Sequence, residues 1–166
     1  MPIVRRLYVD DWALYRDTRL AALRDAPDAF GSTFAREAAF ADDEWRDRLA
    51  AAAVSGRDLP LVAEEGGSAV GLAWVRVGVD ESDVANLYQV WVHPTMRRHG
   101  IGQMLIEHAA IWAASVGACR LALTVALGPD SALEFYRSVG FTEVGVRSWL
   151  RQDADLWQQP MERPLR

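Results

Sequence analysis

The chain has 166 residues, a length typical of one domain, of which 51% are hydrophobic and 25% are charged. These values exclude a chain that is disordered throughout. The formal net charge is -5, and residues 1–83 carry 10 Arg against 16 Asp or Glu, a balance that argues against nucleic-acid binding.

Cysteine and histidine usage gives no sign of a metal site. The single cysteine, Cys119, excludes an intramolecular disulfide and a multi-cysteine zinc site. No pair among His93, His99 and His108 has a helical metal-binding spacing.

The longest stretch without Arg, Asp or Glu, residues 84–96, is too short for a membrane span. We expect a cytoplasmic protein that contacts no membrane.

The first half predicts strands and helices in a mixed order. A strand precedes a helix that begins after Asp10 or Asp11 and ends near Asp25, because Pro27 follows. Residues 26–41 predict an ordered loop or a loop with a short helix. The remaining elements are a helix from Asp42 to Ala53 and strands over Ile3–Leu7, Leu61–Glu65 and Val70–Val79, the last two joined by a turn at residues 66–68.

The second half continues the alternation. A strand over Val84–Val92 extends an antiparallel meander, and a helix follows from Ile101 to just before Gly117. His108 falls on the apolar face predicted for that helix, which favours a structural histidine. The remaining predictions are a strand covered on both faces at Leu121–Ala126, a helix over Pro129–Val139 with a Ser131–Glu134 capping box and Gly140 after its end, and strands over Phe141–Leu150 and Asp155–Arg163, the last at an edge. The whole chain, 1–166, is expected to be one mixed α/β domain.

The junction VHPTMRRHGIGQML, residues 92–105, joins a predicted strand to a predicted helix. Helix starts present unpaired N–H groups, and Gly100 and Gly102 would leave them accessible to a phosphate beside Arg97, Arg98 and His99. A P-loop is excluded because the chain has no lysine, and a dinucleotide fingerprint would need glycine at Leu105. From the glycines alone, a tight turn without a ligand is the simpler interpretation.

This junction closely resembles motif A of the GNAT superfamily of N-acetyltransferases. Residues 97–102, RRHGIG, satisfy its Gln/Arg-x-x-Gly-x-Gly/Ala signature. A second match, A-x-x-FY-x-x-x-GF at residues 132–141, resembles motif B. The resemblance implies a mixed, mostly antiparallel sheet flanked by helices, with a V-shaped opening between its fourth and fifth strands.

The same resemblance implies a site for acetyl-CoA as co-substrate. The pyrophosphate would bind amides of the loop, the pantetheine arm would bond the main chain of residues 90–92, and Tyr136 would be the acid that protonates the leaving thiolate. Ser131 would partly replace an asparagine contact that relatives make where Pro129 stands. The implied cofactor-binding residues are Val90, Trp91, Val92, Arg97, Arg98, His99, Gly100, Ile101, Gly102, Gln103 and Ser131.

Several alternatives stay open at this point. Asn86 and Gln89 cannot act as the general base. Glu81 and Asp83 have two interpretations: one of them is the base, acting directly or through water, or both belong to a solvated turn. Tyr136 also fits an ordinary core stripe. Cys119 suggests either a covalent acetyl intermediate or, as we expect, an inert core thiol.

We therefore expect direct acetyl transfer to a primary amine in a ternary complex. The alternative is a catalytically silent acetyl-CoA sensor, in keeping with Asn86 and Pro129. The connection between the first helices places phenylalanines among acidic residues, which suits an amine on an apolar body; a covering layer is the other interpretation. A small-molecule acceptor is slightly favoured over a protein amino group, and the resemblance suggests a homodimer. The residues of this connection are Phe30, Phe34, Phe40, Asp25, Asp28, Glu37, Asp42 and Asp43.

Overall fold

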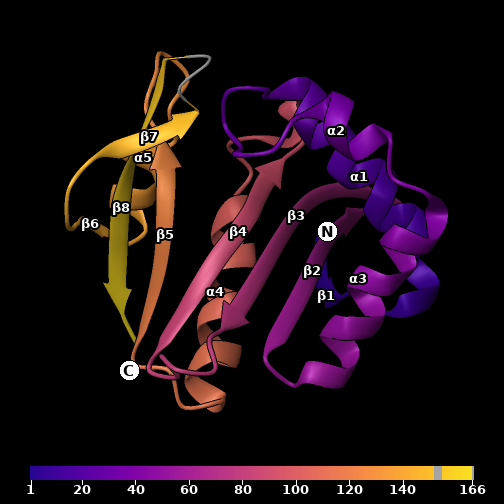
Figure 1. Ribbon diagram of the computed structural model, residues 1–166, viewed down its shortest axis with the longest axis horizontal. Coiled ribbons are helices and arrows are strands. Elements are labelled where there is room, and N and C mark those ends of the chain that lie inside the picture. The colour runs from indigo at the N-terminus through magenta and orange to yellow at the C-terminus, as the bar shows by residue number, and fades with distance from the viewer. Residues whose placement is uncertain (152–154, 166) are drawn as a thin grey trace.

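One mixed β-sheet runs through the molecule (Figure 1). The computed structural model describes residues 1–151 and 155–165. The strand order is β1-β2-β3-β4-β5-β8-β6, with β7 also paired to β8, and every pairing except β4 with β5 is antiparallel. The strands are β1 (Ile3–Arg6), β2 (Asp58–Glu65), β3 (Ser68–Val77), β4 (Val84–Val92), β5 (Arg120–Ala126), β6 (Thr142–Glu143), β7 (Ser148–Arg151) and β8 (Leu156–Pro164). The predicted mixed, mostly antiparallel sheet is confirmed.

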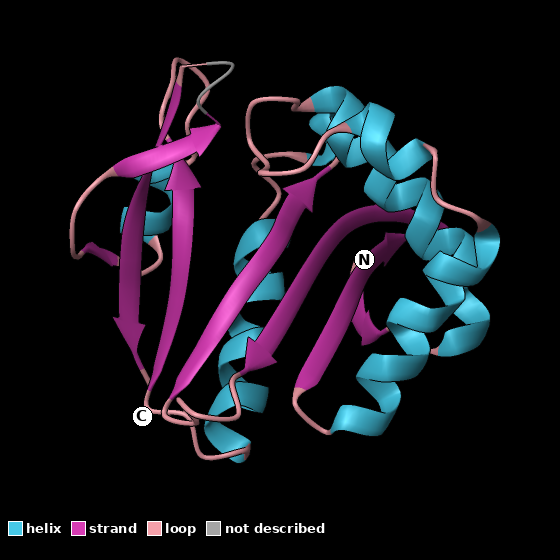
Figure 2. Ribbon diagram, in the orientation of Figure 1, coloured by secondary structure: helices cyan, strands magenta, loops and turns pink. Residues whose placement is uncertain are grey.

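Helices cover both faces of this sheet (Figure 2). Neighbouring residues of a strand point to opposite faces, so Val62 packs with Tyr15 and Trp45 on one side, whereas Leu61 packs with the helix of residues 101–115 on the other. The helices are α1 (Trp12–Asp25), α2 (Phe34–Ala38), α3 (Asp42–Ser55), α4 (Ile101–Ser115) and α5 (Leu133–Ser138), with 3-10 turns η1 (Val9–Asp11) and η2 (Pro94–Met96). Among the described residues, none of these helices is long and apolar enough to cross a membrane.

The two central strands β4 and β5 separate along their length. They pair only where Val84, Ala85 and Asn86 face residues 120–122. Beyond Asn86 the two strands diverge, and Figure 1 shows them meeting at one end of the sheet and splaying apart at the other. The predicted V-shaped opening is therefore present, and it exposes the edge of residues 87–92.

The predicted edge position of the last strand is wrong, because β8 pairs with β5 on one side and with β6 and β7 on the other. Two predicted elements differ in their bounds. The predicted strand over Phe141–Leu150 is split into β6 and β7, because Gly145 takes a left-handed φ of 62° and turns the chain out of the ladder. The predicted helix over Pro129–Val139 begins only at Leu133. The Ser131 hydroxyl donates to the Ala126 carbonyl and accepts from the Leu133 amide, so the predicted capping box with Glu134 is wrong.

Three burial predictions are also wrong. His108 is exposed, because α4 turns residues such as Leu105 and Ala109 to the sheet and leaves His108 at the side. Cys119 is exposed, since it precedes β5 instead of lying within its buried part. The β5 strand is covered on one face only, as its burial alternates and Thr124 is exposed beside the opening.

Candidate active site

A cavity of about 1770 Å³ occupies the opening between β4 and β5 and continues to the other side of β4. On one side it is lined by β5, α5 and the loop before α4. On the other side it is lined by α1, α3 and residues 25–32. A single space thus connects the predicted cofactor region with the predicted acceptor region.

A β-bulge interrupts β4 where it borders this cavity. Between the pairs Leu72 with Trp91 and Trp74 with Tyr88, β3 has one residue and β4 has two, Gln89 and Val90. Gln89 takes a left-handed φ of 59°, a conformation rare for a residue with a side chain. A bulge leaves its extra residue outside the regular ladder, so main-chain groups near Val90 are free to bond a ligand. The sequence contains no glycine at this point that would have revealed the bulge.

The loop before α4 has the backbone of an anion-binding turn. Arg98 and Gly100 both have left-handed φ values, 65° and 80°, and alternation of this kind aims successive amides into one concavity. The Met104 amide is the first in α4 to donate to a main-chain carbonyl, that of Gly100 at 3.0 Å. The amides of residues 101–103 precede it and lie at the cavity wall.

Gly102 is required for a second reason that the sequence did not reveal. A Cβ at this position would lie 2.9 Å from the ring of Phe135. The start of α4 and the helix α5 therefore approach each other closely because Gly102 has no side chain. Gly100, in contrast, has open space around it and is constrained by its positive φ.

Arg97 is held by protein groups. Its Nε donates to the Val92 carbonyl at 3.0 Å, and its Nη2 lies 2.5 Å from the Asp25 carboxylate. The same carboxylate oxygen accepts from the Trp91 indole at 3.0 Å. Asp25 therefore ties the end of α1 to both β4 and the loop, and the guanidinium of Arg97 is committed to this link.

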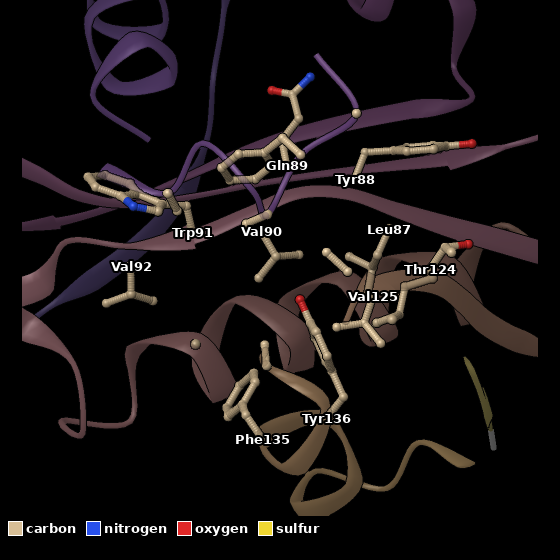
Figure 3. A pocket seen from close by; sticks show the side chains of 18 of the residues that line it. Leu87, Tyr88, Gln89, Val90, Trp91, Val92, Thr124, Val125, Phe135 and Tyr136 are labelled. Carbon is tan, nitrogen blue, oxygen red and sulfur yellow. The ribbon is translucent and has the colours of Figure 1, made fainter. Parts of the chain in front are cut away.

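Tyr136 projects from α5 into the opening. Figure 3 shows its hydroxyl directed toward Val90 and beside Val125, whereas Gln89 points to the opposite side of β4. The side chain is 8% exposed, and among the described residues its hydroxyl has no hydrogen-bond partner. Burial raises the pKa of Tyr136 above its ordinary value, so the phenol stays protonated at neutral pH.

Most of the predicted site residues border the same cavity. His99 is the exception, since it does not line the cavity and its exposed ring bonds the Arg97 carbonyl through Nδ1 at 2.8 Å. Glu81 and Asp83 also lie outside the cavity lining, and Asp83 pairs with Arg120. The predicted residues that do line it are Val90, Trp91, Val92, Arg97, Arg98, Gly100, Ile101, Gly102, Gln103, Ser131 and Tyr136.

A buried cluster of charges lies on the other side of β4, and sequence reasoning missed it. Arg19 of α1 donates from Nε and Nη2 to the two oxygens of Glu37 at 3.2 and 3.0 Å. Arg48 of α3 donates to the same carboxylate at 3.2 Å. Burial alone would raise the pKa of Glu37, but bonds from Arg19 and the nearby Arg48 charge together hold it below the usual range. Glu37 is therefore a buried carboxylate ion.

This cluster reaches the β4 bulge through Tyr15. The Tyr15 hydroxyl donates to the Gln89 side chain at 3.0 Å. Burial raises the pKa of Tyr15, and the neighbouring positive charge of Arg48 opposes that shift. Tyr15 is thus a neutral link between the charge cluster and the bulge.

The predicted acidic acceptor surface is not formed. Glu37 and Asp25 are both paired with arginine. Asp42 and Asp43 lie outside the cavity lining and pair with partly exposed arginines of α1 and α3. The spacing of acidic residues in the sequence gave no sign that Glu37 and Asp25 would pair with arginines from other elements.

Comparison with known families identifies the class of protein. The model of the acetyltransferase (GNAT) family matches residues 13–141. The chain therefore belongs to the acetyltransferase (GNAT) family.

Two curated relatives share part of the sequence. An uncharacterized N-acetyltransferase of Methanocaldococcus jannaschii is 33% identical over 97 residues, which cover 55% of this chain and 42% of that protein. The chain thus matches less than half of that relative's length. The ribosomal protein bS18-alanine N-acetyltransferase of Escherichia coli is 29% identical over 103 residues, covering 62% of this chain and 68% of that enzyme.

Solved structures share the fold over its full length. A GNAT-family acetyltransferase from Streptococcus pneumoniae superposes with a TM-score of 0.84 at 19% identity, covering 100% of both chains. A Salmonella typhimurium structure solved with its cofactor acetyl-CoA superposes with a TM-score of 0.75 at 21% identity, covering 100% of this chain and 95% of that one. At these identities the likeness demonstrates the fold.

Proposed function

We propose that the chain transfers an acetyl group from acetyl-CoA to a primary amine by direct attack within a ternary complex. The observation that supports this mechanism is the single cavity that joins both sides of β4, with Tyr136 on one side and Gln89 on the other. Two substrates bound from opposite sides would meet at the bulge. No covalent intermediate is required, and Cys119 does not line this cavity.

The residues present fit acetyl-CoA. The amides of residues 97–103 supply donors for a pyrophosphate, together with the side chains of Arg98 and Gln103. The main chain of residues 90–92 supplies donors and acceptors for the pantetheine arm, and an N–H near Val90 stabilises negative charge on the thioester oxygen. Ser131 borders the same space, although its hydroxyl proton is given to Ala126.

Tyr136 serves as the acid in this proposal. Its buried, protonated phenol donates a proton to the departing thiolate. The amine must first lose a proton, which costs roughly 4.6 kcal/mol at pH 7 for a pKa of about 10.4. Asp25 and Glu37, two carboxylates of the cavity wall, are held in ion pairs, so we propose that water carries this proton away.

Amine-dependent release of coenzyme A from acetyl-CoA, measured with a thiol reagent, tests the proposal. Turnover that requires both substrates, with initial rates following a ternary-complex pattern, is the expected result. Tight acetyl-CoA binding without turnover across a broad amine panel would instead support the sensor, with which Asn86, a residue that cannot act as a base, is in keeping. A burst of coenzyme A release without amine would contradict direct transfer.

We also propose that residues 1–166 act as one cytoplasmic domain and that two copies form a homodimer, the dimer being what the family resemblance suggests. Light scattering during size-exclusion chromatography measures the mass of the assembly. A mass of one chain over a wide concentration range would refute the dimer.

A further inference from the structure

We propose that the amine acceptor is a small molecule that also carries a carboxylate, and that Arg48, supported by the charge of Arg19 behind it, binds this carboxylate on the far side of β4. This inference rests on the proposed function and adds the acceptor's chemical class. The observation behind it is an excess of buried positive charge at the cavity wall.

The excess follows from the pairing within the cluster. Glu37 is the single anion bonded to two guanidinium groups, so one positive charge is left over. Arg19 is 5% exposed and Glu37 is 2% exposed. Within the described part of the chain, Nη1 of Arg19 is buried without a hydrogen-bond partner. Buried charges and donors without partners are unfavourable, which indicates that an anion completes the cluster.

Other charges around this part of the cavity do not cancel the excess. Arg76 lines the cavity but is paired with Asp58 at 2.7 Å. Asp25 is paired with Arg97, and the Asp28 side chain is 76% exposed with Arg151 nearby at 3.6 Å. Arg36 is an exposed cation on the same lining. The local balance therefore stays positive.

Aromatic rings hold the two guanidinium groups in place. Arg19 lies over Phe30 at 4.8 Å from the ring centre, and Arg48 lies over Phe40 at 4.7 Å. A stacked guanidinium keeps its N–H edge available for a planar carboxylate. The side chain of Arg48 is 30% exposed and so offers the accessible edge, whereas Arg19 is the fixed charge behind it.

The position of the cluster limits the acceptor's size. Tyr15 contacts Gln89 of the bulge, and Arg48 lies near the same hydroxyl. The Tyr15 hydroxyl thus lies between Arg48 and the strand where transfer is proposed. An α-amino acid has its amine and carboxylate close together, so it could bind the arginines while its amine faces the opening.

A matched series of acceptors tests this class on the unmodified protein. The panel holds the protein amino acids, their amides and the amines lacking the carboxylate, each assayed for coenzyme A release. We expect at least one amino acid with a kcat/KM roughly tenfold above its own amide, given the strength of charge-assisted hydrogen bonds. Turnover of amides or simple amines with no preference for carboxylates would overturn this inference and leave the proposed function intact. Absence of turnover with every amine would overturn both.

Arg48→Gln tests the residue assignment. The preference for amino acid over amide should fall toward one, mainly through KM. Arg46→Gln is the matched control, because Arg46 lies on the same helix, pairs with Asp43 and does not line the cavity. Thermal unfolding and acetyl-CoA binding of both variants verify that they fold. An unchanged preference in a folded Arg48→Gln variant would refute the site.

Discussion

The two sides of β4 differ in how their chemistry is constructed. The cofactor side consists mainly of backbone: the bulge at Gln89 and Val90, and a loop with left-handed residues at Arg98 and Gly100. The acceptor side consists of side chains from separate helices, with Arg19, Glu37 and Arg48 joined in one buried cluster. Backbone sites tolerate changes of side chain, whereas a buried charge cluster depends on each of its members.

Tyr136 is the side chain of the cofactor side for which we expect the largest effect. In Tyr136→Phe we expect kcat to fall by about 10² to 10⁴, the usual contribution of a general acid, with little change in acetyl-CoA affinity. The pKa of Tyr136 is raised above the ordinary tyrosine value of about 10, so the phenol keeps its proton up to that pH. We therefore expect no fall in kcat from ionisation of Tyr136 at any pH below about 10. Steady-state kinetics from pH 6 to 10 and calorimetric binding measure both quantities.

Tyr8→Phe is the control, since Tyr8 is exposed and lies outside the cavity lining. A Tyr136→Phe variant within twofold of the unmodified kcat would show that the side chain has only a packing role.

Removing the charge of Glu37 tests the acceptor side through stability. Glu37→Gln leaves the buried Arg19 guanidinium and the partly exposed Arg48 guanidinium without their anion and should lower the free energy of unfolding by about 3 to 5 kcal/mol. The pKa of Glu37 is lowered on folding, so its contribution is present above the unfolded value and is lost as pH falls through the folded value. The difference in free energy of unfolding between the unmodified protein and Glu37→Gln should therefore shrink below about pH 4.3.

Urea unfolding at several pH values provides the measurement. Glu44→Gln, at an exposed position of α3, should change stability by less than about 0.5 kcal/mol. A similar small change for Glu37→Gln would contradict the dependence of the cluster on its anion.

The same contrast explains what could be predicted from the sequence. The family resemblance carried by the motifs around Gly100 and Tyr136 implied the sheet, its opening and the loop, because these motifs are local in the chain. The bulge at Gln89 was missed because its left-handed residue is not a glycine and is held by the neighbouring strand and by the bond from Tyr15. The pairing of Arg19 with Glu37 was missed because it depends on how α1 and α2 pack, and charge spacing does not reveal which arginine faces which carboxylate.

Gly102 permits a test of whether packing or ligand access explains a motif glycine. Gly102→Ala gains about 1 kcal/mol of helix propensity but loses about 1 to 3 kcal/mol through overpacking against Phe135. We expect Gly102→Ala to lower the free energy of unfolding slightly when Phe135 is present, and to raise it when the protein also carries Phe135→Leu. The coupling between the two changes should be about 1 to 2 kcal/mol.

Urea unfolding of the four proteins gives the coupling, and acetyl-CoA binding gives the effect on the ligand site. Gly78→Ala serves as the control, because an added Cβ would meet only an ordinary contact at 3.8 Å and Gly78 does not line the cavity. Two results together would show that Gly102 is needed for ligand access alone. The stability effects of Gly102→Ala and Phe135→Leu would be additive, and acetyl-CoA binding would be lost in the single and the double variant that carry Gly102→Ala.

The link at Asp25 joins the two sides and should have the smallest effect. Asp25→Asn removes the ion pair with Arg97, which is partly exposed, and should cost about 0.2 to 1 kcal/mol. Because the asparagine oxygen can still accept from the Trp91 indole, Asp25→Ala should cost about 1 kcal/mol more by leaving that buried N–H without an acceptor. Added salt should reduce the ion-pair contribution and leave the indole contribution unchanged. Urea unfolding at low and high salt separates the ion-pair contribution from the indole contribution. Equal stabilities for Asp25→Asn and Asp25→Ala would mean that the indole bond adds nothing and that the link is purely electrostatic.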